Sequence, residues 1–277
     1  MINRLAYLFL LLATLALIRC TKDDPVGPSR DDFRYPLEPG SVWIYDRSIN
    51  LDFHPRSGTR AADSIHATIR IEVIGEEMLF DTLATIKVRE QVEQDATSLT
   101  NYNFYQNRDE ALYLIAVVGG AVALPKKTTG VNHAFAPVFS ARFDIISGLD
   151  GNLIPIAVDS LHLEKPAKVV LRYPLTAGVE WTYSEKNRPR RIKKRVLGDT
   201  EVNTPIGTFK AVKVQWIVDF DGDGEFDDNL DYIDFIADQG LVKRSFLIRN
   251  LPLLDDDGGN IGYYDYHDQS FLVSFTK

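Results

Sequence analysis

Acidic side chains recur at alternate positions in one short segment of the chain. The run Asp219-Phe220-Asp221-Gly222-Asp223-Gly224-Glu225-Phe226-Asp227 has the spacing DxDxDGxxD, which matches most of the first nine positions of an EF-hand calcium loop. Ca²⁺ is a hard cation that takes about six to eight oxygen ligands, and carboxylates at alternate positions of a turning loop can converge on one point. The segment therefore predicts a structural calcium site.

The candidate ligands extend slightly beyond this run. They are Asp219, Asp221, Asp223, Glu225, Asp227, Asp228 and Asp231. Leu230 stands where an EF-hand has its bidentate Glu, so Asp228 or Asp231 would have to replace that ligand. The flanking residues 212–218 and 232–236 alternate like strands, and we expect calcium to stabilise a β-hairpin with a dissociation constant on the order of 10⁻⁴–10⁻³ M. A solvated acidic hairpin tip and a catalytic metal are the alternatives.

The charge of the chain is concentrated in the same place. The 277 residues carry a net charge of -8, which disfavours a nucleic-acid partner. Residues 219–238 contain nine acidic residues and no Lys or Arg. Charges this dense repel one another, and a bound divalent cation would offset the repulsion.

Other chemical motifs are weak or missing. The second acidic cluster, 255–260, lacks the alternate spacing and is typical of a hairpin turn. The five histidines have no HxH or HExxH spacing, and no GxSxG, P-loop or dinucleotide-binding motif occurs. No motif therefore predicts an enzymatic activity. The basic run 188–195 could meet anionic headgroups or glycans, but it is more typical of a solvated hairpin that could also face the acidic one.

The N-terminus indicates export. Arg4 precedes an apolar stretch from Leu5 to Ile18, which is too short to span a bilayer and is typical of a signal peptide over residues 1–19. Cys20, the only cysteine, follows it and resembles the acylated cysteine of a bacterial lipobox, although Arg19 stands where a small residue is expected. Residues 20–33 are predicted to form a lipidated tether.

One motif occurs twice. Segments 34–45 and 172–183 both follow RYPLxxGxxWxY, with seven identities in twelve positions. We infer two tandem β repeats, 34–165 and 166–277, that arose by internal duplication. Trp43 and Trp181 lie in this motif and are predicted to anchor the core, with glycan stacking as the alternative.

Alternating runs such as 65–73, 209–216 and 271–275 indicate strands, and no segment keeps a helical apolar stripe over three turns. The predicted fold class is mainly β, with two tandem antiparallel units and little helix.

The repeated PLxxGxxWxY opening, the run 204–214 (TPIGTFKAVKV) and the DQGLVK segment 238–243 resemble an uncharacterised family of exported bacterial β-rich lipoproteins. The resemblance is strongest over 172–248. It implies curved antiparallel sheets, of the half-barrel kind found in periplasmic lipoprotein carriers, and no catalytic residues.

The leading hypothesis is a lipoprotein of the cell envelope, in the outer membrane, that acts as a non-catalytic binding or structural module with a calcium-stabilised hairpin. Its partner would be an envelope protein, a lipid or a glycan. A carrier of lipid or acyl chains predicts an apolar concavity lined by aromatics. A glycan-processing enzyme predicts two carboxylates about 5–10 Å apart in a cleft.

Overall fold

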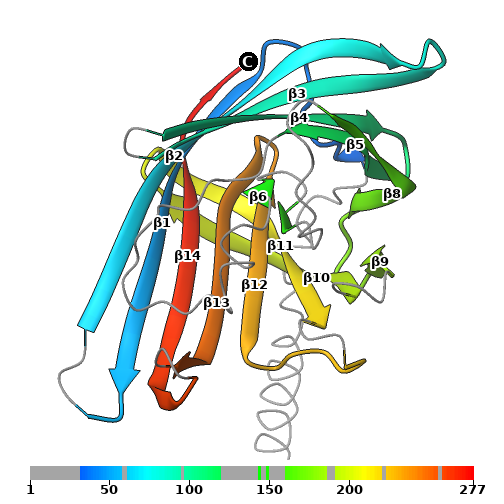
Figure 1. Cartoon of the computed structure of the whole chain (residues 1–277). Helices are drawn as coiled ribbons and strands as arrows, with labels where there is room; N and C mark the ends of the chain where they lie inside the picture. Colours follow the sequence, from blue (N-terminus) through cyan, green and yellow to red (C-terminus); the bar gives the residue numbers. More distant parts are fainter. Residues whose placement is uncertain are drawn as a thin grey trace, which may run out of the picture. The chain divides into compact units, whose positions relative to one another are not determined.

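The folded part of the chain is built from antiparallel β-strands, as the computed structural model in Figure 1 shows. The structure describes residues 32–57, 61–94, 97–119, 143–144, 148–149, 160–185, 191–219, 223–254 and 258–277. The predicted signal peptide and most of the predicted tether, with Cys20, lie outside these ranges. One compact unit extends from Phe33 to Lys277. In the described part of the chain, no helix has the length and hydropathy needed to cross a bilayer.

Two runs of long strands make up this unit. The first contains β1 (Val42–Pro55), β2 (Ala61–Leu79), β3 (Leu83–Gln94), β4 (Thr97–Asn107), β5 (Ala111–Gly119) and β8 (Leu161–Arg172). The second contains β9 (Glu180–Ser184), β10 (Arg191–Thr204), β11 (Gly207–Asp219), β12 (Leu230–Ala237), β13 (Gly240–Leu254) and β14 (Asn260–Thr276). A separate small ribbon pairs β6 (Phe143–Asp144) with β7 (Gly148–Leu149).

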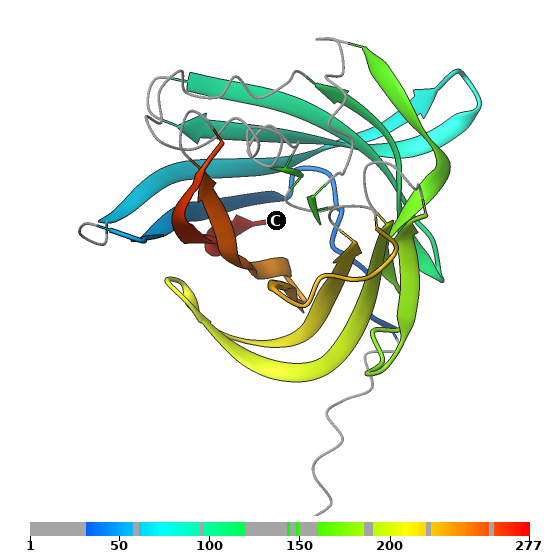
Figure 2. The same cartoon turned by 60° about the horizontal axis from the view of Figure 1, so that its bottom comes forward.

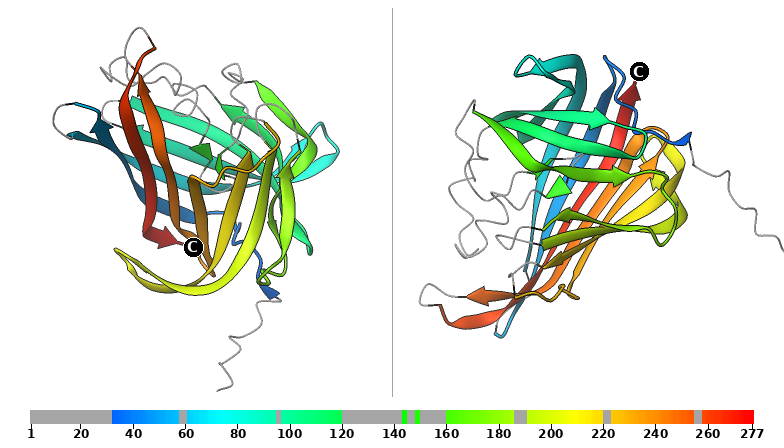
Figure 3. Two further views of the ribbon diagram at one scale, coloured as in Figure 1. Left: turned by 90° about the horizontal axis from the view of Figure 1, so that it is seen from below. Right: turned by 90° about the vertical axis from the view of Figure 1, so that its right-hand side faces the viewer.

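All twelve long strands belong to one sheet, in the order β8-β5-β4-β3-β2-β1-β14-β13-β12-β11-β10-β9. Each run is an up-and-down meander, and the two runs join where β1 pairs with β14. The sheet curves so far that its two outer strands, β8 and β9, come to face each other, which gives a nearly closed, barrel-like ring (Figures 2 and 3). Closure of this kind leaves few exposed strand edges, which protects a long sheet from edge-to-edge association.

Side chains of β9 and β10 make hydrogen bonds to the main chain of β8 across the seam. The Trp181 indole donates a hydrogen bond to the Val169 carbonyl at 2.9 Å, and Lys194 Nζ donates to the Val170 carbonyl at 2.8 Å. Pro166 lies in β8, and a proline, which has no N–H, is tolerated in a strand at the edge of a sheet.

The period-two pattern of the strands determines what fills the ring. In β12 the buried positions alternate with half-buried ones from Leu230 to Ile236, and β9 and much of β14 show the same alternation, whereas β5 is buried at nearly every position. The alternating residues form one continuous core cluster that extends through both runs of strands. The mainly antiparallel β fold predicted from the sequence is confirmed.

The two copies of the RYPL motif share a hydrogen bond made by their glycine, although the Tyr-Pro peptide bond is cis only in the second copy. Gly40 and Gly178, both with positive φ, donate backbone hydrogen bonds to the carbonyls of Val73 and Val196. In both hairpins the pairing shifts by one residue immediately after that valine, which produces a β-bulge that bends the strands. The predicted boundary between repeats at 165/166 falls within β8, and the duplication itself stays a prediction.

Candidate functional site

The acidic segment forms the connection between β11 and β12. Asp219 is the last residue of β11 and is buried, whereas Asp223 and Glu225 are exposed in the loop. Asp221 lies outside the described residues. The loop connects two paired strands, as the sequence predicts for a β-hairpin.

Local hydrogen bonds fold the loop back on itself. The Asp219 carboxylate accepts a bond from the Gly224 N–H at 3.1 Å, and the Asp223 carboxylate accepts one from the Glu225 N–H at 2.8 Å. Gly224 has a φ of 97°, a conformation that an L-residue with a side chain rarely adopts. Asp227 donates its backbone N–H to the Val218 carbonyl at 2.9 Å. The loop therefore has a defined turn in which carboxylates serve as backbone acceptors.

Arg191, at the start of β10, supplies a positive charge beside this loop. Its Nε lies 3.8 Å from Asp219 Oδ2, and its guanidinium donates to the Gly224 carbonyl and lies 4.4 Å from the centroid of the Phe226 ring. Arg191, a member of the basic run 188–195, thus faces the acidic loop. Part of the countercharge that the sequence analysis assigns to calcium is present as a guanidinium.

The other described acids do not gather around one point. Asp231 pairs with Arg249 on β13 at 2.7 Å. Among the residues that the structure describes, no three His, Cys, Asp or Glu side chains are grouped closely enough to hold a metal ion. Because Asp221 is not described, the calcium site stays a prediction.

Three consecutive basic residues of β10 alternate between the two faces of the sheet. Lys193 and Arg195 contact the Glu180 carboxylate at 3.0 and 2.6 Å, and hydrogen bonds from Lys193 and then Arg195 lower the pKa of Glu180. Lys194 points the other way, is fully buried, and lies 3.5 Å from the centroid of the Trp216 ring.

The two motif tryptophans are buried. Trp43 has 0% and Trp181 has 5% of its surface exposed. The Trp43 indole donates to the Gln239 carbonyl at 2.5 Å, as the Trp181 indole does to that of Val169. Buried rings whose N–H groups are satisfied by the main chain have the environment of core anchors.

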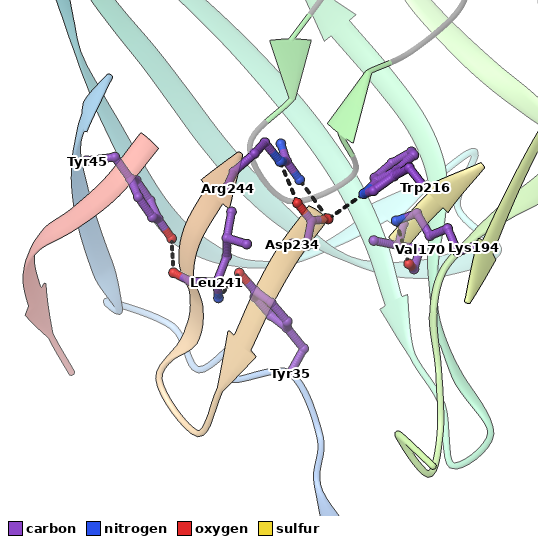
Figure 4. A network of polar contacts seen from close by, with 8 residues as sticks. All are labelled: Tyr35, Tyr45, Val170, Lys194, Trp216, Asp234, Leu241 and Arg244. Atoms are coloured by element: carbon purple, nitrogen blue, oxygen red, sulfur yellow. Dashed lines mark hydrogen bonds and ion pairs between the residues drawn. The ribbon is translucent and has the colours of Figure 1, made fainter. Parts of the chain in front are cut away.

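The interior of the ring contains a buried polar network that was not predicted from the sequence. Arg244 on β13 holds the Asp234 carboxylate on β12 with two hydrogen bonds of 2.6 and 3.0 Å, and Trp216 on β11 donates to the same carboxylate at 2.7 Å (Figure 4). Arg244 and Asp234 are each only 1% exposed. Hydrogen bonds of this number compensate the cost of burying the two charges.

The same close view shows how the first motif reaches this interior. The Tyr45 hydroxyl donates to the Leu241 carbonyl at 2.9 Å, and the Leu241 N–H donates to the Tyr35 hydroxyl at 3.2 Å (Figure 4). Burial raises the pKa of Tyr45 well above its usual value. The phenol therefore stays protonated and keeps its role as a donor.

A second ion pair, in which Asp268 is buried and Arg47 is half-buried, lies where the two runs of strands join. Arg47 on β1 donates to Asp268 on β14 at distances of 2.5–3.2 Å, and the Tyr266 hydroxyl adds a bond of 3.2 Å. Burial raises the pKa of Tyr266, and the neighbouring Asp268 carboxylate raises it further. One signal in the sequence could have found both pairs. Asp234, Arg244 and Asp268 each occupy an inward position of an otherwise apolar alternation.

Comparisons with known proteins give two similar solved structures. One is described as a "putative lipoprotein" from Parabacteroides distasonis, with 12% identity and a TM-score of 0.30, covering 87% of this chain and 97% of that chain. The other is a "putative exported protein with YmcC-like fold" from Bacteroides fragilis, with 11% identity and a TM-score of 0.28, covering 88% of this chain and 99% of that chain. No protein-family model matches the chain, and no curated protein matches its sequence.

Proposed function

We propose that the protein is a lipoprotein of the cell envelope, anchored through Cys20 in the outer membrane, whose ring of strands acts as a non-catalytic binding or structural module. The apolar run 5–18, the following Cys20 and the polar tether support export and anchoring. The compact unit begins at Phe33, the last residue of the predicted tether. Its partner would be an envelope protein, a lipid or a glycan.

The proposal that the module is non-catalytic rests on the ion pairs that hold its buried carboxylates. Asp234 is paired with Arg244, Asp268 with Arg47, and Glu164 with Lys168 at 3.3 Å. Carboxylates that perform acid–base catalysis need access to a substrate, whereas these carboxylates are held by cations inside the ring. The arrangement favours a rigid framework.

The alternative hypothesis, a carrier of lipid or acyl chains, requires a cavity inside the ring. A carrier would line a cavity with inward-facing aromatics, but here Trp216, Tyr232 and Phe246 pack on one another across neighbouring strands, with centroid distances of 4.6 and 5.1 Å. Rings in mutual contact stabilise the wall of the ring instead of enclosing a ligand.

Lipid extraction tests this choice. We expect the intact protein, purified from membranes and extracted with organic solvent, to release no lipid in amounts near one per chain beyond its own covalent anchor. The measurement is mass spectrometry of the extract, with protein refolded from denaturant as the control. A stoichiometric lipid in the native sample alone would favour the carrier.

We also propose that Ca²⁺ binds the β11–β12 hairpin. The alternate spacing of Asp219, Asp221 and Asp223 and the positive φ of Gly224 support it, because both suit a loop that turns around an ion. Arg191 would then share with calcium the task of offsetting the negative charge of the loop. The role of the ion would be structural.

Calcium should raise the stability of the wild-type protein. At 10 mM Ca²⁺, a dissociation constant between 10⁻⁴ and 10⁻³ M corresponds to about 1.4–2.7 kcal/mol. Thermal melting with and without Ca²⁺ measures this, and the rise should be lost in Asp221→Ala plus Asp223→Ala.

Two further variants sharpen the calcium test. Asp255→Ala plus Asp256→Ala removes two charges from the other acidic cluster and should keep the calcium response. Arg191→Ala should enlarge it, because the loop then depends on the ion alone. If millimolar Ca²⁺ did not change the melting temperature of the wild-type protein, the proposed calcium site would be wrong.

A further inference from the structure

Two segments mark one end of the ring, which we call the tether end. Residues 33–41 pass over it: the Asn107 side chain donates to the Tyr35 carbonyl at 2.8 Å, and Gly40 donates to the Val73 carbonyl at 2.9 Å. Residues 173–179 do the same in the second run of strands, through the bond from Gly178 to Val196. The chain that carries Cys20 therefore enters the folded unit at this end.

Two hairpins extend beyond this end. β2 and β3 continue past the Val73 bulge to a turn at Phe80, and β10 and β11 continue past the Val196 bulge to a turn at Ile206 (Figure 1). Both turns therefore lie on the edge of the sheet at which β1 begins, and Figure 1 shows the first at the upper right and the second at the left, on opposite sides of the ring.

The exposed apolar side chains are concentrated on these hairpins. Among the described residues, eight large hydrophobic side chains are exposed, and five of them lie on β2–β3 or β10–β11: Ile74, Met78, Phe80, Leu197 and Ile206. Phe80 is the most exposed of the eight, at 62%. Single exposed hydrophobics are normal, but two apolar turns at one end of a molecule indicate a contact surface.

The turn at Phe80 is also unusual in its backbone. Phe80 and Asp81 have φ values of 52° and 58°, and Thr82 donates to the Leu79 carbonyl at 3.2 Å. Such turns favour Asn and Gly, and a bulky residue with positive φ is rare. The turn therefore presents an aromatic ring to solvent in a conformation that a smaller residue would adopt more easily.

We propose that the turns at Phe80 and Ile206 rest in the interface of the phospholipid bilayer to which the chain is anchored. Cys20 and Phe33 are 13 residues apart, so the linker spans at most about 45 Å. A link this short gives an effective concentration in the millimolar range, at which a weak apolar contact is populated. Glu76, Glu77 and Asp81 lie beside the first turn, so the contact would be hydrophobic and insensitive to salt.

The proposal rests on the anchoring at Cys20 proposed above, and its test supplies the anchor chemically. The chain 20–277 is attached through Cys20 to phosphatidylcholine vesicles that contain a maleimide lipid and brominated phosphatidylcholine, which quenches nearby tryptophan. The native tryptophans are at most 5% exposed and give a constant background. Phe80→Trp and Ile206→Trp report on the two turns, and Tyr263→Trp reports on an exposed position near the β13–β14 turn.

We expect brominated lipid to quench the tryptophans at 80 and 206, with a blue shift of their emission, and to leave the one at 263 unchanged. Equal quenching at all three positions, or none at 80 and 206, would overturn the proposal. So would a dimer, seen by sedimentation and lost in Phe80→Ser, since the turns would then contact a second copy. Failure of cells to acylate Cys20 would refute the anchoring but not this contact, because the attachment here does not depend on acylation.

Discussion

Replacing Arg244 with alanine is expected to lower the free energy of unfolding by about 3–5 kcal/mol, because it leaves the Asp234 carboxylate buried without its cation. Urea unfolding followed by tryptophan fluorescence measures this loss, and Trp216, which donates to Asp234, reports on the site directly. The double variant Asp234→Asn plus Arg244→Ala should be less destabilised than Arg244→Ala alone, because no unpaired charge remains.

Arg249 provides a matched control on the same strand. It pairs with Asp231 at 2.7 Å, but both side chains are nearly half exposed. Solvent screens such a pair, and Arg249→Ala should cost no more than about 1 kcal/mol. If the two arginine variants lost the same stability, the buried network would not contribute as we describe.

The second large effect is expected at Trp43. The ring is fully buried, stacks on Phe275 with a centroid distance of 5.4 Å, and lies in the motif that leads into β1. Trp43→Ala should cost about 3–5 kcal/mol, which for a unit of this size lowers the melting temperature by roughly 10 °C. Differential scanning calorimetry would measure the shift.

Tyr263→Ala, at an exposed aromatic, is the control for Trp43 and should change stability by less than about 0.5 kcal/mol. A Trp43→Ala protein with unchanged melting but weakened glycan binding would contradict core anchoring and favour the stacking alternative.

The fold class could be predicted from the sequence because it depends on local information. The alternation in runs such as 65–73 and 209–216 follows directly from the period of a strand with one buried face, and these runs lie within β2 and β11. Most of the acidic run 219–231 likewise lies on the connection between β11 and β12, because glycine and acidic residues are disfavoured in a buried strand.

The interior network could not be predicted in this way. Asp234 and Arg244 come from different strands, and their pairing depends on the register of β12 against β13, which places them opposite each other. That register is set by the two-residue connection between Ala237 and Gly240 and by the bulge between Phe235 and Ile236, and the sequence pattern does not locate the bulge. The sequence did place a charged residue, Asp234 or Arg244, at a position where the alternation predicts a buried apolar one. Because buried charges need a partner, each of them indicates an oppositely charged residue on a neighbouring strand.

The same reason applies to the acidic loop. Sequence spacing suggested that its carboxylates would converge on an ion, but Asp231 pairs with Arg249 and Arg191 lies beside Asp219. Both arginines come from other hairpins of the sheet. Spacing along one loop therefore does not show which of its acids contact a cation on a neighbouring strand.

Mass spectrometry of the protein purified from bacterial membranes tests the proposed anchoring most directly. The account predicts a mature chain that begins at Cys20 and carries diacylglyceryl and acyl groups on that residue, and a Cys20→Ser variant that is released from the outer-membrane fraction. An N-terminus elsewhere with an unmodified Cys20, or a Cys20→Ser protein that stays in the membrane, would contradict it.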